Sequence, residues 1–300
     1  MALDALAYYA SQGPVSDPGG HAPALDGLPA EMHQLCEVVQ GLVAQPGWAL
    51  VYGWTIAKER EEDLQLRLVA LMLGRILELD DRPLGATRSP EARLVGNCRD
   101  HTMLLVAMLR HQEIPARARC GFGAYFLPGK YEDHWVCEYW NAAEERWQLA
   151  DAQLNARQRE ILRIDFDTCD VPRNRFVVAG MAWQMCRRGE ANPDDFGLTT
   201  VNEHGTWWVR QNLVRDLAAL NKVELLPWDG WGLAQGMSNT LPEGDLLLLD
   251  RVATLTQQDD AFAELSAVYE AEEALRVPAV IRSNGSRGGR LVDISAPATP

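Results

Sequence analysis

The sequence predicts an α+β fold, in which a helix packs on an antiparallel sheet and additional helices occur N-terminal and C-terminal to this core. Apolar residues recur at helical spacing through residues 98–110, which indicates a helix with one buried face. Alternating residues in 116–126 and two aromatic-rich runs within 134–151 are typical of strands, and the two runs should form a hairpin. Helical periodicity recurs before residue 80 and after residue 176.

The N-terminal third of the chain begins with loop composition and continues with two predicted helices. Glycine and proline are frequent in residues 11–30, so we assign residues 1–28 to an N-terminal loop segment. Pro29–Val43 and Ile56–Leu79 each carry an apolar stripe at helical spacing, and the second opens with acidic residues that the helix dipole favours. Residues 80–91 are a charged connector that contains proline.

A cysteine lies at the predicted start of the central helix. Asn97 is a good N-cap, and Asp100 can close a capping box behind it, which places Cys98 in the first helical turn. The backbone N–H groups and the positive end of the helix dipole favour thiolate over thiol there. Pro115 ends the helix, and the strand after it contains Gly121 and other small residues that allow close backbone approach.

The predicted hairpin pairs a histidine with a carboxylate. If the turn is symmetric, with two or four residues in the loop, Val136 lies opposite Leu149 and His134 lies opposite Asp151. Directly opposed side chains have Cβ atoms roughly 4.5–5.5 Å apart, close enough for a carboxylate to orient an imidazole. A loop of odd length would break the pairing, because a one-residue slip sends one of the two to the other face.

The C-terminal half is predicted to be largely helical and rich in tryptophan. Five of the ten tryptophans follow residue 156, where they either fill a core or form the wall of an apolar substrate pocket. The tail 277–300 is rich in glycine, serine and proline, and we expect it to be mobile or a loose hairpin. The expected helices lie within residues 154–161, 177–188, 207–221, 245–255 and 261–275.

Composition limits the possible partners and the compartment. A formal net charge of −14 over 300 residues argues against nucleic-acid and anionic-membrane partners, which need a basic face. The six cysteines contain no CxxC pair, so we expect a reducing compartment and no disulfide framework. The first 20 residues lack a basic segment before a hydrophobic run, and no apolar stretch is long enough to cross a membrane. We therefore expect a cytoplasmic protein.

The order Cys98, His134, Asp151, together with the sequence around each residue, resembles the transglutaminase-like superfamily, in particular its bacterial stand-alone members. The resemblance covers about residues 90–155. It implies a papain-like core in which Cys98 is the nucleophile, His134 the general base and acid, and Asp151 the orienting carboxylate. The superfamily includes transamidases, peptidases, amidases and inactive members. The blocks that carry the resemblance are Gly96–Asp100, Leu109–Arg110, Ile114–Arg117, His134–Glu138 and Trp147–Asp151.

The resemblance also implies a layout for the whole chain. We expect a single transglutaminase-like domain over 29–276, with the catalytic core at about 90–155 and a helical, tryptophan-rich extension at about 156–276. Cysteine-dependent acyl transfer through a thioester would hydrolyse or transamidate an amide or ester of a peptidic or small acyl substrate. The alternative is a non-catalytic binding protein that uses the same scaffold and a tryptophan-rich pocket.

An acyl-transfer site also needs an oxyanion hole and substrate contacts. The Cys98 backbone N–H is one expected donor, and the second is unidentified, with Tyr52, Trp54 and Gln65 as unranked candidates. Trp135 could shield the histidine or face the core. Arg117 and Arg119 could attract a substrate carboxylate, although solvated residues at a strand edge are the simpler interpretation. We name Trp135, Arg117, Trp183 and Trp207 as candidate substrate contacts.

Other cysteines and histidines have competing interpretations. Cys137 and Cys120 are expected to be packing residues, and His101, one turn along the helix from Cys98, is a rival general base. Structural zinc normally uses two close ligand pairs, and the Cys98–His101 spacing supplies only one. The prediction is therefore no metal site and no cofactor, and oligomeric state cannot be inferred from the sequence.

Overall fold

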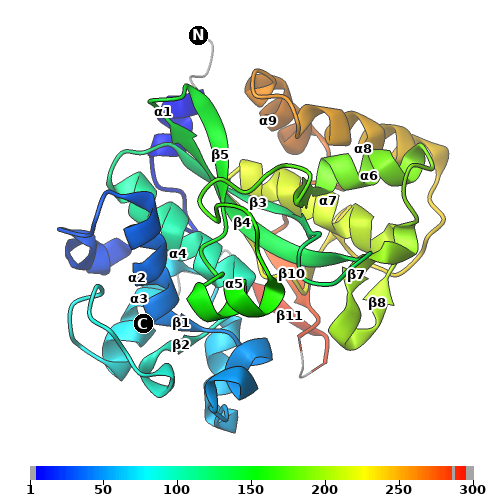
Figure 1. Cartoon of the computed structure of the whole chain (residues 1–300). Helices are drawn as coiled ribbons and strands as arrows, with labels where there is room; N and C mark the ends of the chain where they lie inside the picture. The colour runs from blue at the N-terminus through cyan, green and yellow to red at the C-terminus, as the bar shows by residue number, and fades with distance from the viewer. Residues whose placement is uncertain (1–4, 286–287, 295–300) are drawn as a thin grey trace. The chain divides into compact units, whose positions relative to one another are not determined.

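The computed structural model describes residues 5–285 and 288–294, and it confirms a mixed α+β fold (Figure 1). Two compact units are distinguished by their internal contacts. The first, here the Cys98 unit, comprises residues 6–118 and 136–171. The second, here the His134 unit, comprises residues 119–135 and the described residues from 172 onward. The prediction of a single domain over 29–276 is not tested by this division and stays a prediction.

The Cys98 unit is built around α4 (Cys98–His111), whose residues from Arg99 to Arg110 are all buried. Helix α2 (Met32–Leu42) packs against α4, as predicted from its apolar stripe. Two short parallel strands, β1 (Val43–Ala44) and β2 (Leu94–Val95), lead into this region. Its other elements are η1 (Gly19–Leu25), η2 (Pro46–Tyr52), η3 (Lys58–Gln65), α3 (Val69–Leu79), η4 (Pro90–Ala92) and α5 (Ala156–Leu162), while α1 (Ala5–Ala10) begins one residue before the unit.

The single helix predicted over 56–79 is wrong, because the structure has two separate elements there. The 3₁₀ helix η3 ends at Gln65, Leu66 and Leu68 are extended, and α3 begins at Val69. Asp63 accounts for the interruption. Its buried carboxylate accepts hydrogen bonds from Arg60 Nε (2.8 Å), Arg75 Nε (3.0 Å) and the Val95 backbone N–H (3.3 Å). A straight helix would not direct all these donors to one carboxylate.

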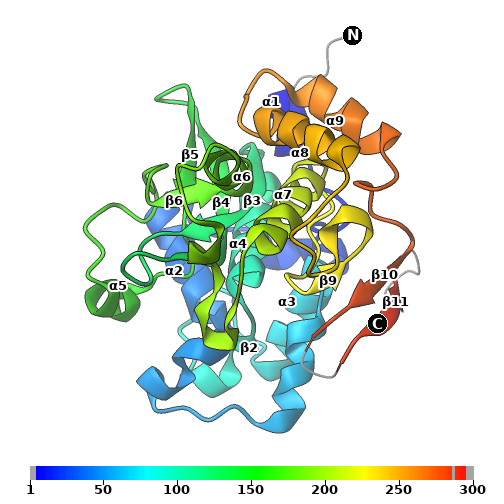
Figure 2. The ribbon, with the colours of Figure 1, turned by 90° about the vertical axis from the view of Figure 1, so that its right-hand side faces the viewer.

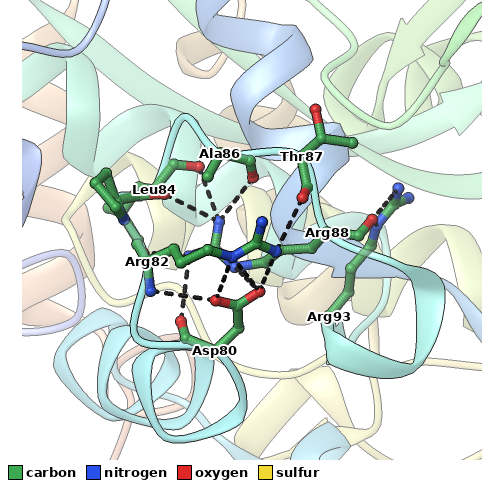
Figure 3. Close-up of polar contacts among 8 residues, drawn as sticks. Asp80, Arg82, Leu84, Ala86, Thr87, Arg88 and Arg93 are labelled. Atoms are coloured by element: carbon green, nitrogen blue, oxygen red, sulfur yellow. Dashed lines mark hydrogen bonds and ion pairs between the residues drawn. The ribbon is translucent and has the colours of Figure 1, made fainter.

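The connector between α3 and β2 is organised by a buried arginine (Figure 3). Arg88 donates through Nη1 to the Leu84 and Ala86 carbonyls, at 3.1 and 3.0 Å, and through Nη2 to the Arg82 carbonyl at 2.6 Å. Arg82 in turn forms an ion pair with Asp80. A segment that the sequence indicates only as a charged connector is therefore a compact loop whose carbonyls converge on one guanidinium.

The β4–β5 hairpin differs from its predicted register by two residues. Strand β4 (Tyr131–Asn141) pairs antiparallel with β5 (Arg146–Ala150), and Leu149 lies opposite Glu138 instead of Val136. The turn is centred one residue later than predicted, because the Asn141 side-chain oxygen accepts from the backbone N–H groups of residues 143 and 144. Glu145 adopts φ +50° to close this loop. The predicted pairing of His134 directly opposite Asp151 is therefore wrong.

The largest sheet among the described residues has the strand order β6-β3-β4-β7-β8, with β5 also paired to β4. Strand β3 pairs antiparallel with β6, but β7 pairs parallel with β4, so the expectation of an antiparallel sheet holds only in part. Gly121 allows the backbones of β3 and β6 to approach closely, because a Cβ there would lie 2.4 Å from the Val177 carbonyl oxygen. The bounds are β3 (Ala116–Gly123), β6 (Phe176–Val178), β7 (Phe196–Leu198) and β8 (Glu203–His204).

Helices of the His134 unit pack on one another (Figure 2). Among them, α7 (Thr206–Leu220) is buried from Trp207 to Leu220. All four predicted helices after residue 176 are present. Part of the predicted tail is ordered, since β10 (Val280–Ser283) and β11 (Arg290–Asp293) form an antiparallel pair beside β9 (Asp229–Gly230). Residues 295–300 of that tail lie outside the described residues. The remaining elements are α6 (Ala179–Arg187), η5 (Pro193–Asp195), η6 (Thr199–Val201), η7 (Gly232–Ala234), α8 (Glu243–Leu255) and α9 (Phe262–Ala271).

Membrane-spanning helices are not found in the part of the chain that the structure describes, because none of its helices is both long and apolar enough.

Candidate active site

Cys98 is the first residue of α4 and is held there by the predicted capping box. The Asn97 side chain accepts hydrogen bonds from the backbone N–H groups of Arg99 and Asp100, and the Asp100 carboxylate accepts from the Asn97 N–H at 2.9 Å. The Cys98 N–H is not used by this box. Cys98 is partly exposed, whereas Arg99 to Arg110 of the same helix are buried. A reactive side chain on a rigid buried element is well suited to precise positioning.

His101, the rival base, is buried on the first turns of α4. Its Nδ1 donates to the Asn97 carbonyl at 2.9 Å. A small pocket of the Cys98 unit is lined by His101 together with Tyr52, Gln153 and Asn155. The role of His101 as a rival general base stays a prediction.

Asp151 follows β5 in the Cys98 unit and is buried. Its backbone N–H donates to the Thr168 carbonyl at 2.8 Å, and its Oδ1 accepts from the Gln153 N–H at 3.0 Å. The chain after β5 therefore folds back, and a second bond from the Val171 N–H to the Leu149 carbonyl, also 2.8 Å, secures it. These contacts restrict the position of the carboxylate that the sequence assigns as orienter.

His134 belongs to the other unit, on β4, and is buried. Within that unit its ring lies in an aromatic surround made by Tyr125, Phe126 and Phe176, with ring centroids at 6.1, 4.8 and 6.3 Å. The adjacent Asp133 carboxyl accepts from Trp208 Nε1 and Asn212 Nδ2, and burial raises its pKa. This aromatic surround limits the access of water to the imidazole. Exclusion of water from an acyl-transfer site favours acceptors other than water.

The two strand arginines are ion-paired in the interior, so the interpretation of solvated strand-edge residues is wrong. Arg117 forms a 2.6 Å ion pair with Glu138, and its guanidinium lies over the Trp147 ring at 4.1 Å. Arg119 forms a bidentate pair with Asp216. A guanidinium already neutralised by a buried carboxylate has little charge left to attract a ligand, so the surroundings of Arg117 give its predicted substrate contact no support.

The candidate substrate-binding tryptophans are packed inside the His134 unit. Trp183 is fully buried and its Nε1 donates to Asp250 at 2.7 Å, while Trp207 packs edge-on against Trp208 with ring centroids 5.0 Å apart. Trp135 is also fully buried, on β4. These contacts match the packing alternative from the sequence, and the roles of Trp135, Trp183 and Trp207 in substrate binding stay predictions.

The other thiols have environments unlike that of Cys98. Cys120 and Cys137 are fully buried, in agreement with their expected packing roles, and burial raises the pKa of the Cys137 thiol well above its ordinary range. Burial also raises the pKa of Cys186, to about 11. The pKa of Cys36 is raised mainly by a hydrogen bond with Cys169 and, to a smaller extent, by burial. Each raised value disfavours the thiolate that a nucleophile needs.

None of the three candidates for the second oxyanion donor is singled out by its contacts. The Tyr52 hydroxyl accepts from Asn155 Nδ2 at 2.7 Å and lines the small pocket beside His101. Trp54 packs in an apolar cluster with Val95, and the Gln65 carbonyl accepts from the Arg67 guanidinium. The role of each of the three as second donor therefore stays a prediction.

Comparison with protein families finds a match for the second quarter of the chain. The family model of the transglutaminase-like superfamily matches residues 77–152. This segment is transglutaminase-like. It contains α4, β3, β4 and β5, and with them Cys98, His134 and Asp151 in the order that the sequence resemblance requires. The match supports a cysteine-dependent catalytic role.

Comparison with solved structures finds a protein from Cytophaga hutchinsonii, provisionally named a cysteine protease, at 17% identity and a TM-score of 0.33. The aligned region covers 57% of this chain and 44% of that protein, so the chain spans less than half of the length of its structural relative. Among curated proteins, none matches the chain. The assignment of residues 77–152 as transglutaminase-like therefore depends on the family match and not on this structural likeness.

Proposed function

We propose that this protein is a cysteine-dependent acyl-transfer enzyme, in which Cys98 is the nucleophile, His134 the general base and acid, and Asp151 the carboxylate that orients the imidazole. The observation that carries the proposal is the position of Cys98 as the first residue of a capped helix within the transglutaminase-like segment. Helix N-termini favour thiolates, and the match extends over all three residues. The coarser part of this proposal is that the chemistry depends on a cysteine. It depends less than the finer part on the individual roles of His134 and Asp151.

The proposed reaction begins when the Cys98 thiolate attacks the carbonyl carbon of an amide or ester. The tetrahedral oxyanion receives a hydrogen bond from the Cys98 N–H, which the capping box leaves unused, and from a second donor. Protonated His134 gives its proton to the leaving amine or alcohol as the C–N or C–O bond breaks, and a thioester remains on Cys98. His134 then takes a proton from water or an amine, whose attack on the thioester releases the acyl product and regenerates the thiolate.

The acceptor and the substrate determine which kind of acyl-transfer enzyme the protein is. Water gives a peptidase, amidase or esterase, and an amine gives a transamidase. The aromatic surround of His134 supports a site that limits access of water, which favours an amine acceptor when one is bound. We propose a peptidic or small acyl substrate.

The first test is selective alkylation of Cys98 by iodoacetamide as a function of pH, with peptide mass mapping of all six cysteines. We expect Cys98 to react well below about pH 8.5, the ordinary range of a thiol, and before the other five. His134→Ala should shift this reactivity to higher pH. The matched control is His204→Ala, which removes a half-exposed histidine of the same unit. Its alkylation profile should equal that of the unchanged protein.

A second test looks for the thioester directly. Activated esters and peptide amides are incubated with the protein, with and without a primary amine, and intact mass is followed over time. An acyl adduct on Cys98 that is absent from Cys98→Ser and persists longer in Asp151→Asn would support the assigned roles. Alkylation of Cys98 no faster than that of an ordinary thiol, together with the absence of any adduct, would instead favour a binding protein.

A further inference from the structure

Three side chains with metal-binding atoms meet in the Cys98 unit, away from the capped start of α4, and a fourth lies beside one of them. The Nδ1 or Nε2 atom of His33, a carboxylate oxygen of Asp167 and the Sγ of Cys169 all lie within 4.8 Å of one another. The Sγ of Cys36 lies 3.8 Å from that of Cys169. His33 and Cys36 are one turn apart on α2, and Asp167 and Cys169 belong to the loop after α5.

The separation of the two sulfurs agrees with tetrahedral zinc. Two thiolates bound to one zinc ion at ~2.3 Å lie about 3.8 Å apart, which is the separation of Cys36 and Cys169. His33 Nε2 and Asp167 Oδ1 are 2.9 Å apart, so a small outward movement of these two half-exposed side chains would admit the ion. Both cysteines are buried, at 3% exposure, whereas the His33 and Asp167 side chains are half-exposed.

A second carboxylate orients the histidine as metal sites require. Glu31, the N-cap of α2, accepts a hydrogen bond from His33 Nδ1 at 2.9 Å, which directs Nε2 toward Asp167. Histidine ligands generally donate their other ring N–H to a carboxylate or carbonyl, and this partner fixes the tautomer that binds the metal. The ring is therefore held in a binding orientation by a residue that also caps its helix.

The loop that carries Asp167 and Cys169 is hydrogen-bonded to the backbone of Asp151. Thr168, which lies between Asp167 and Cys169, accepts the hydrogen bond from the Asp151 N–H at 2.8 Å. An ion that holds both loop residues against α2 would therefore also restrict the backbone of the proposed orienting carboxylate. This consequence depends on the proposed function, whereas ion binding itself does not.

We propose that His33, Cys36, Asp167 and Cys169 form a tetrahedral site for a thiophilic divalent cation of the zinc type, which fastens the loop after α5 to α2. The two thiols and the His33 Nε2–H lose their protons to solvent as the metal–ligand bonds form, and no redox change is involved. The pairs His33-x-x-Cys36 and Asp167-x-Cys169 supply the two close ligand sets that structural zinc uses. The sequence prediction of no metal site weighed Cys98, His101, His111, His134 and Cys137 as ligands and did not consider these two pairs.

The test is metal binding by the full chain, stripped with chelator in the presence of reductant. Zn²⁺ affinity is measured by competition with a chromophoric chelator, and Co²⁺ is used as a spectroscopic probe. We expect one ion per chain and a near-ultraviolet charge-transfer band from two cobalt–thiolate bonds. Cys169→Ser should remove most of this band, and His33→Asn, at an exposed position that folding tolerates, should weaken Zn²⁺ binding by tenfold or more. Glu31→Gln should cost about 10–100-fold.

Matched controls are available in the other unit. Cys186→Ser removes a partly buried thiol, and His204→Asn removes a histidine whose exposure and acidic partner resemble those of His33. Both should bind Zn²⁺ as the unchanged protein does. The proposal is overturned if the stripped protein binds no Zn²⁺ at micromolar free concentration, if the His33 and Cys169 variants keep full affinity, or if a Cys36–Cys169 disulfide persists in reductant and excludes the ion. None of these readouts depends on catalysis.

Discussion

Asn97 positions Cys98 through its side chain, and this local device could be read from the sequence. An N-cap and a capping box involve residues at most three positions apart, so their pattern survives without knowledge of the fold. The structure confirms both the cap and the buried face of α4. The second oxyanion donor could not be predicted in the same way, because a donor such as Tyr52 reaches a pocket from a distant part of the chain.

Removal of the cap should reduce both stability and thiol reactivity. Asn97→Ala leaves two backbone N–H groups of α4 without their acceptor, and we expect a loss of about 1 kcal/mol in the free energy of unfolding, measured by urea denaturation. Iodoacetamide should also react with Cys98 only at higher pH, because the first turn is less rigidly formed. Asn155→Ala is the control, since Asn155 caps α5 with a similar box. A change of Cys98 reactivity in that variant would argue against a local effect.

Asp80 should give the protein part of its acid sensitivity. Its hydrogen bond with Arg82 lowers the pKa of the Asp80 carboxyl to about 2, from an ordinary value near 3.8 (Figure 3). A lowered folded-state pKa stabilises the folded protein above the unfolded value, and this contribution is lost as the pH falls from about 4 to 2. Asp80→Asn should therefore flatten the pH dependence of the unfolding free energy in that window. An unchanged slope would show that this ion pair forms equally in the unfolded chain.

At the scale of elements, the sequence predicted most helices and strands but not how charged residues are used. Arg117 and Arg119 alternate with small residues on β3, a pattern that fits a solvated strand face equally well. Their partners, Glu138 and Asp216, are 21 and 97 residues away along the chain. The hairpin register failed for a related reason, since the hydrogen bonds of Asn141 move the turn by one residue.

Removal of one partner of the Arg119–Asp216 pair should lower the unfolding free energy strongly, whereas replacement of both by apolar residues should lower it little. Asp216→Asn leaves a buried guanidinium without a counter-charge, and we expect a loss of about 3–5 kcal/mol in unfolding free energy. The double variant Arg119→Met with Asp216→Leu should regain most of it. As a control, Asp170→Asn breaks the half-exposed pair with Arg146 and should cost less than about 1 kcal/mol. Equal losses at the two sites would contradict the difference in burial.

Close approach of β3 and β6 gives a second element-scale prediction. In Gly121→Ala the new methyl group would meet the Val177 carbonyl oxygen, and the strands must separate, so we expect a loss of about 1–3 kcal/mol. Gly244→Ala, in the exposed first turn of α8, has open space around it and should stabilise the protein by up to about 1 kcal/mol. Thermal unfolding of the two variants, compared with the parent, measures both effects. A neutral Gly121→Ala would contradict the close packing of these backbones.

For the whole molecule, the sequence predicted the fold class and a catalytic core, whereas the two units could not be foreseen. Periodicity and motifs report on short windows, but each unit is assembled from separate stretches of chain. The transglutaminase-like segment 77–152 itself contributes residues to both units. The four ligand-type side chains of α2 and the loop after α5 were missed for the same reason, since 130 residues or more separate the two pairs.

The interleaving of the two units imposes an order on folding during synthesis. Residues 119–135 leave the ribosome before the Cys98 unit is complete at residue 171, yet their strand partners β6 and β7 are made only afterwards. Phe122, which packs against Phe196 of β7, therefore remains incompletely covered while later residues are translated. A pause in translation near residue 171 would prolong this exposure, and binding by a chaperone that recognises apolar strands would be greatest at that chain length.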